Sequence, residues 1–269
     1  MAAFTTVTHC TAALLPVLLI AACAPLPPED RAPSGAFDAE SVPDAVPRPE
    51  PLSRYGNPES YVVFGERYEV LRDARGYVER GIASWYGEKF HGARTSSGEP
   101  YDMYAMTAAH KTLPLPSYVR VTNLENGRSV VVRVNDRGPF KDNRLIDLSY
   151  AAALKLDIVR RGTGLVEVRA LDPQAPPGEM PATTSPVALG HTPAMYLQVG
   201  AFAQEANALY LRQRLERAGV GAVHVLAGEV NGEMLYRVRL GPFAAVEALD
   251  NASRAVESLG LRDLHVVVE

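Results

Sequence analysis

The sequence predicts a mainly β domain followed by a smaller α+β domain. Proline and glycine are both plentiful, at 21 residues each in a chain of 269, which favours turns and short strands over a helical bundle. Short apolar runs separated by turn residues recur through the first half of the chain. The C-terminal part alternates strand-like and helix-like patterns in the order β-α-β-β-α-β, which is typical of a ferredoxin-like unit.

Composition divides the chain into five segments. The length suits one or two ordinary domains, and two stretches rich in proline separate them. We expect a signal peptide at 1–22, a lipidated cysteine and disordered tether at 23–54, a first domain at 55–172, a linker at 173–193 and a second domain at 194–269. The net charge of −4 gives no sign of a nucleic-acid partner.

The first segment resembles a bacterial lipoprotein signal. Residues 12–22 are apolar, but about 20 apolar residues are needed to span a bilayer, so this run favours the hydrophobic region of a signal peptide. Small residues before Cys23 resemble a lipobox, which implies acylation of Cys23, and Ala24 after it favours the outer membrane. The alternative is a plain secretory signal cleaved near Ala22. Residues 1–10 contain no Lys or Arg, although a signal peptide normally begins with positive charge.

Alternating and apolar runs locate the elements of the first domain. An Asn-Gly pair at 126–127 is a strong hairpin signal between two of the runs. We expect one short helix at 148–156 and strands at 61–64, 68–71, 78–86, 118–123, 129–135 and 164–171. Several short strands with one helix predict a small β-barrel, although composition alone does not choose its topology.

The second domain begins with a strand at 195–202. Residues 205–218 have apolar Ala208, Leu211 and Leu215 at helical spacing. Further strands are expected at 221–226, 234–240 and 264–268, with a second helix at 244–259. Along the strand at 234–240 the side chains alternate, so Arg237 and Arg239 share the face opposite the helices, which we also expect to carry Gln198.

Candidate chemistry in the first domain centres on Glu99, His110 and Asp136. Asp136 follows the apolar face of Val130, Val132 and Val134, so alternation places its carboxyl at a partly desolvated barrel mouth. Such a site favours the protonated form that a general acid needs. The neighbouring Arg137 falls on the other face, and Arg133 is expected to be solvated.

The sequence around these three residues contains several specific motifs. It runs from Gly81-Ile82-Ala83-Ser84-Trp85-Tyr86-Gly87 through Ser97-Gly98-Glu99-Pro100-Tyr101-Asp102 and Ala108-Ala109-His110-Lys111 to Val134-Asn135-Asp136-Arg137-Gly138-Pro139-Phe140. This stretch closely resembles the septal ring lytic transglycosylases of the rare lipoprotein A family. The resemblance implies a double-psi β-barrel, the fold shared with expansins, and cleavage of peptidoglycan glycan strands without water. It also implies that Asp136 is the acid/base and that Glu99 and His110 assist it.

Two further sets of residues are candidates for binding sugar. Tyr86 and Tyr101 are rings that could stack on a glycan. In the last domain the runs 198–202 and 236–243 resemble the signature strands of a SPOR domain, which binds glycan stripped of stem peptides. Amide and guanidinium donors at Gln198, Arg237 and Arg239 suit such a ligand. The resemblance thus implies an outer-membrane lipoprotein enriched at the division septum, with unspecified divisome partners.

Two other functions remain open from the sequence. The first is a non-catalytic, expansin-like glycan-binding or wall-loosening lipoprotein, since a fold can persist without its chemistry. The second is a hydrolase that uses Glu99 and Asp136 as a carboxylate pair. We expect no metal or cofactor, because six scattered histidines show no ligand spacing and both cysteines lie within the first 23 residues.

Overall fold

The computed structural model describes residues 32–33, 35, 37–141, 143–174, 193–230 and 232–269. The predicted signal peptide, Cys23 and most of the predicted linker lie outside the described residues. Within the described part of the chain, no helix is both long enough and apolar enough to cross a membrane.

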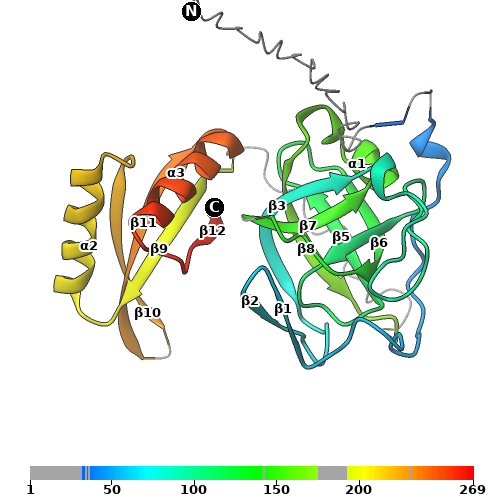
Figure 1. The fold of residues 1–269 in the computed structure, drawn as a ribbon, viewed down its shortest axis with the longest axis horizontal. Helices are drawn as coiled ribbons and strands as arrows, with labels where there is room; N and C mark the ends of the chain where they lie inside the picture. The colour runs from blue at the N-terminus through cyan, green and yellow to red at the C-terminus, as the bar shows by residue number, and fades with distance from the viewer. Residues whose placement is uncertain (1–31, 34, 36, 142, 175–192, 231) are drawn as a thin grey trace, which may run out of the picture.

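Six strands of the first domain close into a barrel (Figure 1). Around the wall they are β3 (Val78–Tyr86), β7 (Arg144–Ser149), β4 (Thr107–His110), β6 (Ser129–Asp136), β5 (Ser117–Asn123) and β8 (Gly164–Leu171). β3 pairs with β7 in parallel, as β4 does with β6, and the other neighbours are antiparallel. The predictions missed β4 and β7. The predicted helix at 148–156 begins too early, because residues 148 and 149 end β7 and α1 spans Tyr150–Lys155.

The barrel interior is filled by alternate residues of these strands. Val119 and Val121 of β5 and Val132 and Val134 of β6 have no exposed surface. Burying a valine stabilises the fold by roughly 1.5 kcal/mol or more, so strict alternation holds each strand in register. The predicted turn joins β5 to β6, and Gly127 adopts a φ of +73° there.

A hairpin precedes the barrel, and three short 3-10 turns lie outside the strands. The hairpin consists of β1 (Ser60–Val63) and β2 (Glu66–Glu69), whose bounds are close to those of the predicted strands at 61–64 and 68–71. The 3-10 turns are η1 (Ala39–Ser41), η2 (Glu88–Phe90) and η3 (Val159–Arg161).

Residues 37–57, which we call the strap, lie along the barrel wall. The prediction that 23–54 is a disordered tether is therefore wrong for residues 37–54. Ala39 is buried, and Ala45 donates its N–H to the carbonyl of Val131 at 3.0 Å. Asp44 accepts from the N–H of Val131 at 2.9 Å and from Lys155 at 2.9 Å. The barrel supplies these partners, so composition alone could not reveal the ordered segment.

The second domain has the predicted β-α-β-β-α-β order. Its sheet runs β10 (Val223–Val230), β11 (Glu233–Phe243), β9 (Met195–Phe202) and β12 (His265–Val268), all antiparallel. Helices α2 (Glu205–Ala218) and α3 (Val246–Ser258) contact the sheet. Ala208, Leu211 and Leu215 are buried in its core, as their spacing predicts.

The two domains touch where β12 lies beside β3 (Figure 1) and where α3 meets the side chains of Asn143 and Arg144. Arg144 of the barrel and Asp250 of α3 form an ion pair at 2.8 Å, and their side chains are only 3% and 15% exposed. Asn143 donates to the same carboxylate at 3.1 Å. An apolar cluster surrounds the contact and contains Ile82, Leu124, Leu165, Met195, Leu249 and Val268. The second domain is thus docked on the barrel by both charge and packing.

Candidate active site

Asp136 ends β6 at a break in the β4–β6 ladder. Ala108 pairs with Val134 but Ala109 pairs with Asp136, so one residue of β6 is left out of register. Three donors reach the same oxygen of Asp136: the N–H and the hydroxyl of Ser96 and the N–H of Arg137, each at 2.7 Å from Oδ1. Among the described residues, none donates a hydrogen bond to Oδ2. The carboxyl is therefore fixed through one oxygen while the other can meet a ligand.

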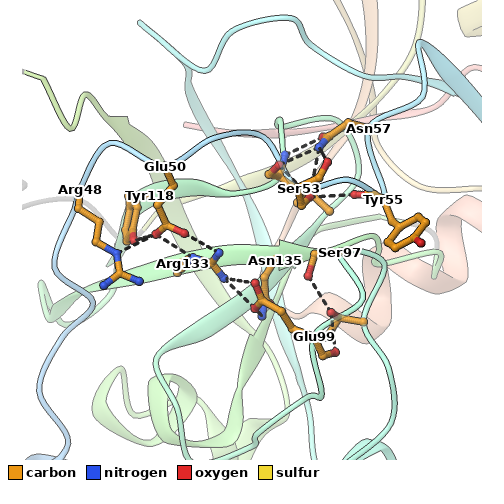
Figure 2. A network of polar contacts seen from close by, with 12 residues as sticks. Arg48, Glu50, Ser53, Tyr55, Asn57, Ser97, Glu99, Tyr118, Arg133 and Asn135 are labelled. Carbon is orange, nitrogen blue, oxygen red and sulfur yellow. Dashed lines mark hydrogen bonds and ion pairs between the residues drawn. The ribbon is translucent and has the colours of Figure 1, made fainter.

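Glu99 is bound by two side chains of β6, those of Arg133 and Asn135 (Figure 2). Arg133 donates to both Glu99 oxygens, at 3.0 and 2.8 Å, and Asn135 donates to Oε2 at 2.9 Å. Burial alone would raise the pKa of Glu99, but the hydrogen bonds from Arg133 and Asn135 outweigh it and lower that pKa. Glu99 is therefore kept ionised, and its carboxylate is bound to Asn135, the residue that precedes Asp136.

Arg133 is not solvated as the sequence predicts. Its guanidinium also donates to Glu50 of the strap, at 2.9 Å between Nη2 and Oε2, and its side chain is only 18% exposed. Burial would lower the pKa of Arg133, but the two carboxylates raise it. Burial would raise the pKa of Glu50, but hydrogen bonds from Arg133, Tyr118 and Arg48 lower it to about 2.

His110 is buried at the end of β4, with 2% of its surface exposed. Its Nδ1 accepts from the N–H groups of Thr112 and Leu113, at 3.2 and 3.1 Å. Its Nε2 therefore carries the proton of the neutral ring and donates to the Tyr77 hydroxyl at 2.8 Å. That hydroxyl donates onward to Glu79 at 2.7 Å.

The surroundings of His110 keep it uncharged. Burial, together with the charges of Arg137 and Lys111, lowers the pKa of His110 from 6.5 to about 3. A cleft of about 240 Å³ between the domains is lined by His110, Glu79, Arg144 and His265 among others. His110 is thus a neutral hydrogen-bonding group at the edge of the domain contact.

Arg137 points away from the Asp136 carboxyl, as strand alternation predicts. Its guanidinium donates to the carbonyl of Gly56 at 2.8 Å and to that of His110 at 3.1 Å. It also reaches Oδ1 of Asn57 at 3.2 Å. Arg137 thereby ties the strap and the His110 segment to the residue after Asp136.

The three predicted catalytic side chains are connected only through neighbours. No hydrogen bond or ion pair joins Asp136, Glu99 and His110 to one another within the described residues. Glu99 reaches Asp136 through Asn135 and through its own loop, where Ser96 binds Asp136. His110 is linked by its carbonyl to Arg137.

Tyr86 and Tyr101 do not offer the open stacking faces that the sequence predicts. Their exposed fractions are 8% and 2%, and the two rings stack on each other with centroids 4.0 Å apart. Within the described part of the chain, the buried hydroxyls of Tyr86 and Thr107 have no hydrogen-bond partner. Burial, followed by the charges of Tyr101 and Asp136, raises the pKa of Tyr86. Tyr86 therefore borders the site as a buried donor.

Asp147 of β7 is a further carboxylate near the site, and it is not among the residues selected from the sequence. Ala109 pairs with Asp136 on one side and with Asp147 on the other. Since neighbouring strands lie about 4.8 Å apart, the two aspartates are about 10 Å apart across a small residue. Ser84 donates a hydrogen bond to Asp147. The alignment of Asp136, Ala109 and Asp147 across three strands follows from the strand pairing, which cannot be read from the sequence.

In the second domain, the predicted binding residues share the sheet face away from the core. Tyr236, Val238 and Leu240 pack in the core, as predicted. Gln198 pairs with Arg239 and accepts from it at 3.3 Å. Arg239 also forms an ion pair with Glu269. Arg237 has no hydrogen bond or ion pair within the described residues, so its donors are available to a ligand.

Metal ligands do not cluster in the described part of the chain. No group of three or more His, Cys, Asp or Glu side chains there could hold a metal ion.

Comparison with known proteins matches both domains. Residues 78–168 match a family described as lytic transglycolase, and residues 192–264 match the SPOR domain. A protein of Pseudomonas aeruginosa (strain UCBPP-PA14) named endolytic peptidoglycan transglycosylase RlpA is 43% identical over 88% of this chain and 83% of its own length. The chain belongs to the RlpA family. Its fold is accordingly a double-psi β-barrel followed by a SPOR domain, as the resemblance implied.

Other RlpA relatives cover parts of the chain. A protein of the same name from Vibrio cholerae is 51% identical over 61% of this chain and 64% of its own length. A solved SPOR domain of RlpA from Pseudomonas aeruginosa is 30% identical, with a TM-score of 0.26, over 27% of this chain and 96% of that domain. The strap lies before the segment that matches the lytic transglycolase family.

Proposed function

We propose that this RlpA-family protein is a lytic transglycosylase that cleaves the glycan strands of peptidoglycan and releases anhydromuramoyl ends. The observation that carries the proposal is the carboxyl of Asp136. Its Oδ1 accepts three hydrogen bonds, so its direction is fixed before substrate arrives. Such preorganisation is what proton transfer to a bound sugar requires. The names of relatives at 43–51% identity support the same activity.

In the proposed reaction Asp136 is first an acid and then a base. It gives its proton to the glycosidic oxygen as the bond from the anomeric carbon of muramic acid breaks. The C6 hydroxyl of the same sugar attacks that carbon, and its proton returns to Asp136. The carboxyl is regenerated and no water is consumed.

Glu99 and His110 act as supporting groups in this proposal. Glu99 is held as a carboxylate by Arg133 and Asn135, so it can accept hydrogen bonds from sugar hydroxyls beside Asp136. His110 is neutral and buried, so it positions the backbone that meets Arg137 rather than exchanging protons with substrate. Tyr86 adds a buried hydroxyl near the site.

The SPOR domain binds glycan strands stripped of stem peptides in this proposal. Gln198, Arg237 and Arg239 lie on one face of its sheet, and donors of this type suit sugar hydroxyls and carboxylates. Acylation of Cys23 would anchor the protein to the outer membrane, and glycan binding would concentrate it at the septum. Cys23→Ser should release it from membrane fractions; unchanged fractionation and mass would reject the anchor.

Product mass after Asp136→Asn tests the chemistry. Asparagine keeps the size and can accept from Ser96, but it cannot donate the proton. We expect the full chain to lose anhydro-product formation from purified, peptide-free glycan by about 10²–10⁴-fold. Binding to the same glycan and the thermal midpoint should hardly change.

Asp157→Asn is the matched control, because that residue is exposed and its φ of +60° suits asparagine. A fully active Asp136→Asn variant would reject the mechanism. Products with ordinary reducing ends would indicate a hydrolase, and intact glycan with normal binding in the unaltered chain would indicate an expansin-like binder.

A further inference from the structure

We propose that Glu50 of the strap is a positioning residue of the active site, because it shares Arg133 with Glu99 and so controls how Arg133 holds that carboxylate. The inference rests on the proposed function, in which Glu99 acts on the sugar. It adds to the site a residue that lies outside the segment matched to the lytic transglycolase family. Figure 2 shows Glu50, Arg133, Glu99 and Asn135 in one continuous chain of contacts.

The guanidinium of Arg133 is divided between two carboxylates. Nη1 donates to both oxygens of Glu99, at 3.0 and 2.8 Å. Nη2 donates to Oε2 of Glu50 at 2.9 Å, and Nε to Oε1 at 3.3 Å. The planar fork of arginine can serve two partners at fixed angles, which a lysine cannot. The position of Glu99 therefore depends on where Glu50 holds the other edge of the fork.

Glu50 is itself fixed from the barrel and from the strap. The Tyr118 hydroxyl of β5 donates to its Oε1, and Arg48 donates to the same oxygen at 3.1 Å. The side chains of Glu50 and Arg133 are each only 18% exposed. Exposed ion pairs contribute little to stability, but a half-buried network with several donors has one defined geometry. The contacts around Glu50 therefore fix the position of the Arg133 guanidinium.

The charge of Glu50 also reaches Glu99 directly. Burial raises the pKa of Glu99, the hydrogen bonds from Arg133 and Asn135 lower it, and the negative charge of Glu50 raises it. Glu50→Gln keeps an oxygen that can accept from Arg133 but removes the negative charge, so it should lower the pKa of Glu99. Removing the charge of Arg133 must raise it. The two substitutions thus have opposite expected signs.

The strap contacts the other flank of the site as well. The carbonyl of Gly56 and the side chain of Asn57 accept from Arg137, which follows Asp136. Asn57 is in turn bound to Leu115 twice. It accepts a hydrogen bond from the N–H of Leu115 at 2.8 Å and donates one to the carbonyl of Leu115 at 2.7 Å. The strap therefore holds both arginines that flank the catalytic end of β6.

The test measures the pH profile of glycan cleavage for Glu50→Gln and Arg133→Gln in the full chain. Because Glu99 acts as a carboxylate, the acid limb of kcat/KM reports its ionisation. We expect Glu50→Gln to move that limb to lower pH and Arg133→Gln to move it to higher pH. Asp44→Asn is the matched control, because it is also a strap carboxylate bound to the barrel and should leave the limb unchanged.

A second measurement needs no catalysis. The Glu99 carboxyl is followed by carbon NMR through a pH titration, with its signal assigned by its loss in Glu99→Gln. We expect its midpoint to fall in Glu50→Gln and to stay unchanged in Asp44→Asn. A Glu99 midpoint in Glu50→Gln that matches the unaltered chain would overturn the proposal. If that midpoint moves while the unaltered chain cleaves no glycan, the role of Glu50 stands and the proposed function fails.

Discussion

The barrel site and the outer face of the SPOR sheet differ in how completely their polar residues are bound to other protein groups. In the barrel, Glu99, Arg133 and His110 are bound to other protein groups, and His110 is almost fully buried. On the sheet, Arg237 has no partner among the described residues. A site for chemistry needs groups that are already oriented, whereas a surface for a long repetitive polymer needs donors that are still free. The difference separates the two roles that we propose for one chain.

The largest effect expected from this difference is the pH dependence that His110 gives to stability. Burial lowers the pKa of His110 from its ordinary value of 6.5 to about 3 in the folded chain. As pH falls below about 6.5, the unfolded chain takes up a proton that the folded chain does not. The free energy of unfolding should therefore fall across this window, by at most about 5 kcal/mol from this group.

His110→Asn should remove that contribution while still accepting from the N–H groups of Thr112 and Leu113. Urea unfolding between pH 4 and pH 7, compared with the unaltered chain, isolates the His110 contribution from the carboxylates that titrate in both. His91→Asn is the control, because His91 has a 45% exposed side chain. Parallel pH dependences for His110→Asn and the unaltered chain would show that His110 is not held neutral.

The sequence predicted most of the fold but not what joins its parts. Alternating valines located β5, β6 and β8, and the spacing of Ala208, Leu211 and Leu215 located α2. β4 was missed because it has only four residues, and β7 was missed because its last two residues were assigned to a helix. Residues 148 and 149 were assigned to a helix because their apolar pattern continues into α1. Parallel pairing is set by tertiary contacts that no local pattern records.

Some residues of the candidate site could be predicted from the sequence and others could not. Glu99, His110 and Asp136 could be selected because they lie in recognisable sequence motifs. Glu50 could not, since 83 residues separate it from Arg133 and its own segment has the composition of a tether. Tyr101 was misjudged for a related reason, because a ring that stacks on another ring looks the same in a sequence as one that stacks on sugar.

The next largest effect concerns the contact between the two regions. Asp250→Ala leaves Arg144 buried without its carboxylate, and breaking such a pair costs about 3 kcal/mol. The SPOR domain can avoid this cost by leaving the barrel, so we expect separation rather than unfolding. Small-angle X-ray scattering should give a larger radius of gyration, while glycan binding is retained. Glu247→Gln, an exposed change on the same helix, should leave the radius unchanged, and an unaltered radius in Asp250→Ala would contradict the docking.

The smallest effect concerns the sheet face itself. Arg237 has no hydrogen bond or ion pair to the residues that the structure describes, whereas Arg239 is held by Gln198 and Glu269 and must exchange those partners for a ligand. Losing one hydrogen-bonding group costs about 0.5–1.5 kcal/mol, so Arg237→Ala should weaken binding to peptide-free sacculi by roughly 3–10-fold. Arg239→Ala should weaken it less. Arg212→Ala on α2 is the control, since its pair with Glu216 is exposed. If all three variants bind equally well, the arginine donors on this face do not bind the glycan, and the proposed difference between the barrel site and the sheet face would be wrong.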